Sequence, residues 1–258
     1  PAMHRIGWFF SWGYMQYLVI ALAGSIVGDM LLKHSRSGEA VRIECYHIAA
    51  ACIALAAMII QLWGLFTRQV LADYASMLQQ TAALMYKTRD EAGFKDASED
   101  FLELIDDMDK LLGTREEFLL GKWLSDARNV GHTQQEKDLY EQNARNQITL
   151  WGNKDCRIKD YACKHWNGMM SGFYRPRWER FFDVVLAAMQ QGVEYDEETF
   201  VEASKDWEWE WTLGNETYMS EPSGSEIEES LRIWDKYHQE ILKLQDNFEY
   251  KEHVAAYV

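Results

Sequence analysis

Apolar residues recur along much of the chain with the period of an α-helix. Between residues 101 and 112 they occupy positions i, i+3, i+4, i+7, i+10 and i+11, which a 3.6-residue period places on one helix face. Gly113 follows directly and is expected to end that helix. The chain has only 16 glycines and 3 prolines, too few for the many tight turns of an all-β protein. The pattern predicts an all-α fold.

Capping signals place the next helices. One helix is predicted over residues 118–130. Thr133, with Glu136 three residues later, forms a capping box that opens another helix ending near Leu150.

Similar signals predict three more helices in the second half of the chain. Pro176 fits the first turn of a helix that ends at Gly192. Two further helices are predicted over residues 197–213 and 226–247. Residues 67–258 should therefore form one domain, a bundle of about seven helices.

Residues 1–66 have a different composition. Two stretches without charged residues, 8–28 and 47–66, are separated by a charged loop. Each is about long enough to cross a bilayer, for which ~20 apolar residues suffice. We interpret this segment as a two-helix hydrophobic hairpin that spans a membrane.

The loop of this hairpin suggests an orientation. Its Lys33, Arg36 and Arg42 make it the basic side, so the positive-inside rule places both ends of the chain outside the cytoplasm. Two alternatives remain open. The two stretches could be helices buried in a larger core, or Arg5 and the small residues at 21–23 could belong to a signal peptide.

Composition and charge exclude several classes of function. A formal net charge of −15 argues against binding to nucleic acid or to anionic lipid. The four cysteines form no C-x-x-C pair and lie at no metal-ligand spacing with the histidines, so we expect no metal. Cys156 and Cys163 would lie about 10 Å apart on one helix, too far for a disulfide. Residues 215–217 (Asn-Glu-Thr) match a glycosylation acceptor and favour a secreted context.

Acidic clusters do not predict a catalytic site. Glycoside hydrolysis needs two carboxylates flanking the bond, and acids gather at Glu99-Asp100, Asp106-Asp107-Asp109 and Glu228-Glu229. These acids fall opposite the apolar helix stripes, which indicates a solvated face. No nucleophile elbow and no phosphate loop occurs either, so we expect neither catalytic residues nor a cofactor.

The polar loop over residues 151–158 is the best candidate for binding. It interrupts two predicted helices and begins with Trp151, whose indole could stack on the apolar face of a sugar. The alternative is a tryptophan that packs between helices.

Four sequence blocks resemble a known enzyme family. They are FLLGKWL at residues 118–124, NARNQITLWG at 143–152, DYA at 160–162 and YRPRW at 174–178. Their order and spacing resemble the α-helical C-terminal region of the α-N-acetylglucosaminidases, glycoside hydrolase family 89. The likeness runs from about Thr67 to about Leu242. The hydrophobic segment does not share it, and its runs at residues 12–14 and 21–24 are similar to helices of the low-temperature-requirement membrane proteins.

The resemblance implies an enzyme that removes terminal α-linked N-acetylglucosamine from glycans such as heparan sulfate, with retention. It implies that both catalytic glutamates lie in a barrel domain that precedes the helices. Since residues 1–66 do not resemble that barrel, we expect the chain to be part of an enzyme and inactive alone. It further implies that Trp151 and Ile158 help to line the sugar pocket. This chain has one more residue than the family pattern between Trp151 and the Asp-Tyr pair at residue 160.

Several other side chains are expected to be structural. Arg145 lies among apolar neighbours and should be ion-paired, because an unpaired buried guanidinium is costly. Arg175 and Arg177 should hold the helix that follows them. Asp160 and Tyr161 should form a helix start and its anchor.

Three tryptophans near residue 209 could pack in either of two environments. Trp207, Trp209 and Trp211 should pack in the core, or against a partner such as the barrel or a second subunit.

Two hypotheses of function follow. The first is an accessory domain that lines one side of a sugar-binding cleft, outside the cytoplasm in a secreted, lysosomal or vacuolar protein. The second is a membrane-anchored helical interaction protein without hydrolase activity.

Overall fold

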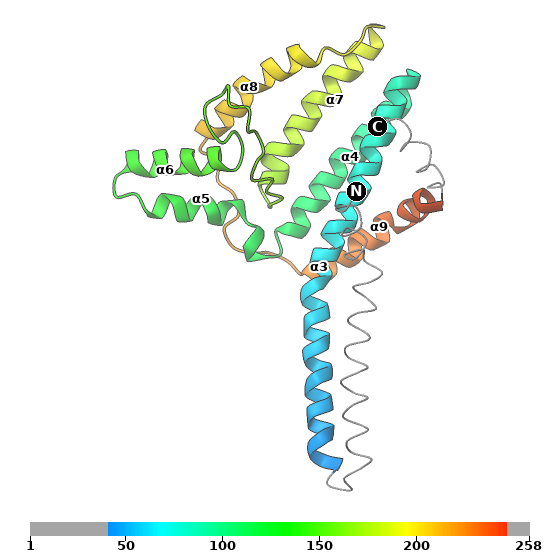
Figure 1. Ribbon diagram of the computed structural model, residues 1–258, viewed down its shortest axis with the longest axis vertical. Coiled ribbons are helices and arrows are strands. Elements are labelled where there is room, and N and C mark those ends of the chain that lie inside the picture. Colours follow the sequence, from blue (N-terminus) through cyan, green and yellow to red (C-terminus); the bar gives the residue numbers. More distant parts are fainter. Residues whose placement is uncertain (1–40, 247–258) are drawn as a thin grey trace, which may run out of the picture. The chain divides into compact units, whose positions relative to one another are not determined.

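The computed structural model describes residues 41–246, with side chains from Leu62 to Lys243, and the predicted all-α fold is confirmed (Figure 1). The chain divides into two compact units, Pro1–Leu62 and Trp63–Val258. The description below concerns the second unit.

The helices of the described residues are α3 (Val41–Thr88), α4 (Glu91–Leu112), α5 (Leu120–Asn129), α6 (Gln134–Gln147), α7 (Arg175–Gln190), α8 (Glu197–Leu213) and α9 (Glu226–Asp246), with a 3-10 turn at Glu116–Phe118 and a π turn at Met170–Tyr174. Short connections join most of these helices, and longer segments lie between α6 and α7 and between α8 and α9. In Figure 1, α5 and α6 form an antiparallel hairpin, and α4 and α7 lie side by side.

The predicted helix ends are present. The Thr133 hydroxyl accepts from the Glu136 amide, and the Glu136 carboxylate accepts from the Thr133 amide, which completes the capping box of α6. Gly113 caps α4, and Gly192, with φ +68°, follows α7. The π turn before α7 was not predicted.

The larger core forms around the apolar stripe of α4. Phe101 packs edge-on against Trp178 and Phe182 of α7, with ring centroids 4.8 and 5.6 Å apart. Tyr74 of α3 and Tyr237 of α9 close the other side, with ring centroids 5.5 Å apart. Burial of these large side chains against one another supplies most of the driving force for folding.

A smaller core surrounds Phe173, which is fully buried. Trp207 stacks on Phe173 with centroids 5.3 Å apart, and Trp211 meets its edge at 4.9 Å. The expectation that these two tryptophans pack in the core is therefore confirmed. This cluster joins α8 to α5, α6 and the π turn.

Arg145 of α6 is buried in this smaller core with none of its surface exposed. Its guanidinium donates to Glu141 at 2.8 Å and to the carbonyl oxygen of Glu216 at 2.7 Å. It lies 4.9 Å from the ring centroid of Trp211 and 5.4 Å from that of Tyr218. The predicted ion pair is confirmed.

The acids of α4 are not all solvated. The prediction was wrong for Asp109, whose carboxylate accepts from the backbone amides of Gly168 and Ser171, and it was wrong for Asp107. The Asp107 carboxylate is 1% exposed and accepts from Arg232, Lys236 and Tyr237 of α9. Burial alone would raise the pKa of Asp107, but the hydrogen bonds from Lys236, Tyr237 and Arg232 lower it to about 2. The cations come from more than 120 residues away, so the local pattern of α4 could not reveal them.

The transmembrane prediction is not supported. Within the described residues, no helix is long and apolar enough to cross a membrane. The predicted span at residues 47–66 falls in α3, a helix that continues to Thr88 and contributes buried Leu71 and Tyr74 to the larger core. The other predicted span, at residues 8–28, lies outside the described residues.

The segment over residues 214–220, here called the strap, crosses the start of α5 closely. A Cβ added to Gly121 would lie 2.3 Å from the carbonyl oxygen of Tyr218 and 2.5 Å from that of Met219. Both are backbone atoms, which cannot rotate out of the way. Only glycine therefore allows the strap to pass at this distance.

Replacing Gly121 by alanine should destabilise the domain, although alanine is the better helix former. Without a clash the change would raise the free energy of unfolding by about 1 kcal/mol. We expect a decrease of about 1–3 kcal/mol, because the added methyl overpacks the contact. Chemical denaturation measures this sign, with Lys122→Ala on the same helix as the control. A gain in stability would show that the strap does not rest on α5.

Candidate functional site

The loop between α6 and the π turn, residues 148–169, begins with a sharp reversal at Trp151. The backbone of Trp151 is left-handed, with φ +59°, which costs a non-glycine residue about 1 kcal/mol. Asn146 holds this conformation, since its carbonyl accepts from the Trp151 amide at 2.8 Å and its side chain donates to the Gly152 carbonyl at 2.6 Å. The reversal turns the indole away from the helix, and Trp151 is 41% exposed.

Three apolar side chains of this loop face solvent. Besides Trp151, Ile158 is 52% and Tyr161 is 72% exposed. The rings of Trp151 and Tyr161 lie 5.4 Å apart. The alternative that Trp151 is sealed between helices is thus wrong, while its role and that of Ile158 in binding stay predictions.

Asp160 and Tyr161 do not form a helix start, so that prediction was wrong. Asp160 has φ +57° and sits in a turn. Its amide donates to the Thr149 carbonyl at 2.8 Å, which closes the loop on itself. Tyr161 is consequently presented beside Trp151. The sequence did not predict this position of Tyr161, because no local pattern indicates that Asp160 has a left-handed backbone.

Buried charges fasten the underside of the loop to α7 and α8. Glu208 of α8 is 3% exposed and accepts from Lys159 at 2.5 Å and from Arg177 at 3.2 Å. Arg177 also pairs with Asp160 at 2.8 Å. Burial alone would lower the pKa of Arg177, but Asp160 and Glu208 raise it above its usual value, so the guanidinium stays charged.

Arg175 and Arg177 both make structural ion pairs, but with different elements. Arg175 ties α7 to α4 through Asp106 at 3.0 Å. Arg177 lies over the rings of Phe173 and Tyr174, 4.9 and 5.2 Å from their centroids, while it holds the loop.

The outer edge of the loop is paired with α8 as well. Lys154 donates to Asp206, and Asp155 lies 3.8 Å from Lys205. The thiols of Cys156 and Cys163 are free and lie in this loop, not on the helix that the sequence suggested.

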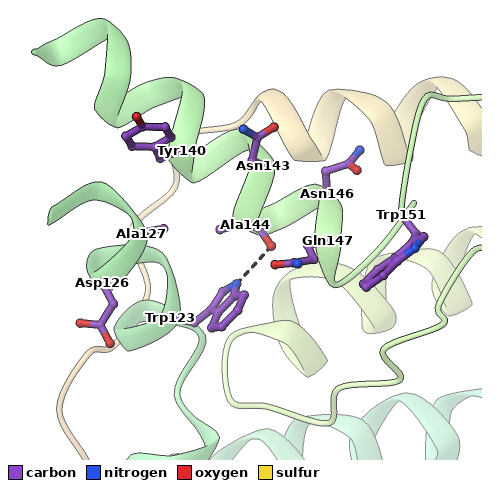
Figure 2. Close-up of a pocket in the computed structure, with 9 residues that line it drawn as sticks. All are labelled: Trp123, Asp126, Ala127, Tyr140, Asn143, Ala144, Asn146, Gln147 and Trp151. Atoms are coloured by element: carbon purple, nitrogen blue, oxygen red, sulfur yellow. Dashed lines mark hydrogen bonds between the residues drawn. The ribbon is translucent and has the colours of Figure 1, made fainter. Parts of the chain in front are cut away.

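A groove of about 530 Å³ adjoins the loop (Figure 2). Its lining comes from α5, α6 and the start of the loop: Trp123, Asp126, Ala127, Tyr140, Asn143, Ala144, Asn146, Gln147 and Trp151. Figure 2 shows Gln147 between the indoles of Trp123 and Trp151. The Trp123 indole N–H donates to the Ala144 carbonyl at 3.1 Å, which fixes that ring at the edge of α6. The groove thus combines aromatic side chains with the side-chain amides of Asn143, Asn146 and Gln147.

This arrangement can bind but is poorly suited to bond cleavage. The carboxylates beside the loop are all in ion pairs with lysine or arginine: Asp155, Asp160, Asp206 and Glu208. Among the nine residues that line the groove, Asp126 is the one acid. Hydrolysis of a glycoside needs two carboxyl groups facing each other across the bond. Within residues 62–243, no group of His, Cys, Asp or Glu is placed to hold a metal ion.

Comparison with known proteins identifies the family of this domain. Residues 65–236 match the family model of the alpha-N-acetylglucosaminidase (NAGLU) C-terminal domain. A human protein, alpha-N-acetylglucosaminidase, is 32% identical over 173 residues, which cover 67% of this chain and 23% of the relative.

Solved structures of a family 89 glycoside hydrolase from Clostridium perfringens are also similar. One, in complex with its substrate GlcNAc-alpha-1,4-galactose, has a TM-score of 0.59 and 29% identity, covering 66% of this chain and 20% of that one. Another, in complex with PUGNAc, has a TM-score of 0.58 and 30% identity, with the same coverage. The chain thus spans about a fifth to a quarter of the length of these relatives.

The helical fold and its loop therefore define an all-α domain of glycoside hydrolases. More narrowly, the chain belongs to the family of α-N-acetylglucosaminidase C-terminal domains.

Arg177 should control the order of the loop. Arg177→Ala removes the cation that Asp160 and buried Glu208 share, and leaves Lys159 as the partner of Glu208. We expect faster amide hydrogen exchange across residues 151–163, where the Asp160 and Cys163 amides now make hydrogen bonds of 2.8 and 2.9 Å.

The matched control is Arg157→Ala, an exposed arginine of the same loop. Exchange in α4 separates a local effect from global unfolding. Equal exchange of the loop in both variants would contradict the anchoring role of Arg177.

Proposed function

We propose that this domain forms one wall of the sugar-binding cleft of a retaining α-N-acetylglucosaminidase and supplies no catalytic carboxylate. The observation that carries the proposal is the exposed group of Trp151, Ile158 and Tyr161 on a loop whose neighbouring acids are all neutralised. Apolar and aromatic side chains of this kind bind the apolar face of a pyranose. The substrate is a glycan with terminal α-linked N-acetylglucosamine, and heparan sulfate is one example.

The loop is suited to this role because ion pairs fasten it to the neighbouring helices. Its charges to α7 and α8 fix the backbone, so the indole is held in place before a ligand arrives. Such pre-organisation reduces the entropic cost of binding. A wall contributes to catalysis by orienting the sugar and excluding water, while bond chemistry falls to groups elsewhere.

The partner in this proposal is a barrel domain that carries the two catalytic glutamates. One of these attacks the anomeric carbon and the other protonates the leaving oxygen. Residues 1–66 do not resemble such a domain. The proposed location is outside the cytoplasm. A membrane-anchored interaction protein, the second hypothesis, gains no support from the described residues.

The chain by itself should be inactive. Purified chain incubated with a nitrophenyl α-N-acetylglucosaminide should release no nitrophenol above the uncatalysed rate. The four carboxylates beside the loop are each paired with lysine or arginine, whereas this hydrolysis needs two carboxyl groups that face each other across the bond. Turnover that disappears when one of the chain's own carboxylates is changed would overturn the accessory role.

Trp151 should matter for substrate binding when the domain is joined to a catalytic domain. In that complete enzyme, Trp151→Ala should raise KM roughly tenfold, the equivalent of about 1.4 kcal/mol, with a smaller effect on kcat. Steady-state kinetics on the same nitrophenyl glycoside measure both constants.

Trp234→Ala is the matched control, because Trp234 is 56% exposed but lies on α9. Unchanged kinetics in Trp151→Ala would remove that indole from the cleft.

A further inference from the structure

The triplet Asn215-Glu216-Thr217 is the one Asn-x-Ser/Thr sequence of the whole chain. It lies in the strap, just beyond Gly214 at the end of α8, where the backbone is neither helix nor strand. Asn215 and Thr217 are exposed. No hydrogen bond joins either side chain to another described residue. The triplet is therefore accessible and its acceptor amide is unoccupied by the fold.

The strap holds this triplet in a fixed position. The carbonyl of Glu216, the middle residue, accepts from buried Arg145 at 2.7 Å. Tyr218 follows and packs closely over two glycines, since an added Cβ at Gly168 or Gly172 would lie 2.8 Å from its ring atoms. With its backbone anchored on both sides, the strap keeps Asn215 directed to the surface.

A polar hollow of about 1150 Å³ lies next to Asn215. Besides strap residues, its lining includes Leu124, Leu139 and Leu213 and the following polar side chains of α5 and α6: Ser125, Arg128, Asn129, Gln134, Gln135, Lys137, Asp138, Glu141 and Gln142. Amides, carboxylates and cations of this kind donate to and accept from sugar hydroxyls. The polar groups of the hollow are thus chemically suited to a carbohydrate.

We propose that Asn215 carries an N-linked glycan whose first sugars rest in this hollow. The donor is a lipid-linked oligosaccharide diphosphate. The side-chain nitrogen of Asn215 forms a bond to C1 of the first sugar, the C1–O bond to the diphosphate breaks, the diphosphate leaves with the electron pair, and the amide loses one proton. The modification rests on the extracytoplasmic location in the proposed function. Because a glycan is bulky and hydrated, it also marks this face of the domain as one that stays in solvent.

The test is the mass of the full chain made in the secretory pathway of eukaryotic cells, before and after treatment with a peptide N-glycosidase. We expect the enzyme to remove one oligosaccharide and to convert Asn215 to aspartate. Asn215→Gln and Thr217→Ala should abolish the modification. Thr217→Ser keeps the acceptor pattern and should retain it. Asn153→Gln, which changes another exposed asparagine, should also retain it.

The outcomes separate the site from the proposed function. Unmodified chain recovered from the medium or from a lysosomal fraction overturns the glycan alone, whereas unmodified chain found only in the cytosol overturns the extracytoplasmic location as well. A modification that persists in Asn215→Gln overturns the assignment to this residue. The experiment measures only the mass and the location of the chain, so its result does not depend on the activity of the complete enzyme.

The position of the first sugars has its own measurement. Amide hydrogen exchange of α6 over residues 134–142 should be slower with the glycan than in Asn215→Gln. Identical exchange in the two forms would overturn the placement of the sugars in the hollow.

Discussion

The fold depends on the burial of one charge, the guanidinium of Arg145. A buried arginine is tolerated only when its donors are satisfied, and here they reach Glu141 on the same helix and the Glu216 carbonyl on the strap. The rings of Trp211 and Tyr218 lie on its faces, so the desolvated cation also gains from two aromatic quadrupoles. One side chain thereby joins α6, α8 and the strap. Trp151 of the candidate binding loop lies only six residues after it in the sequence.

Asp107 and Glu208 are likewise buried charges whose partners lie on other elements. Each is a nearly fully buried acid that accepts from two or more cations or hydroxyls on other elements. Asp107 fastens α9 to α4, and Glu208 fastens the loop to α7 and α8. Removing one partner from such a group is costly, so these clusters specify how the elements are arranged as well as stabilising them. In an acidic protein, the acids that matter for architecture are the few that are buried.

These ion pairs hold the loop in place and occupy the four carboxylates beside it, Asp155, Asp160, Asp206 and Glu208. With these acids ion-paired, Trp151, Ile158 and Tyr161 remain as the exposed apolar and aromatic side chains of the loop, which suit recognition of a sugar. The rigid attachment of the loop keeps Trp151 and Tyr161 in one place. Under the proposed function, the domain contributes binding surface to the cleft. It contributes no catalytic carboxylate, because the acids beside the loop are used in ion pairs that hold the loop in place.

The sequence by itself determined the class of fold, most helix ends and the candidate loop. Helical periodicity, the capping box at Thr133 and the glycines that end helices are local signals, and local backbone preferences decide them. The exposure of Trp151 and Tyr161, the burial of Asp107 and the π turn before α7 were settled only by tertiary structure. Each depends on partners or dihedral angles fixed by residues far along the chain, and a one-dimensional pattern carries no record of which distant groups will meet.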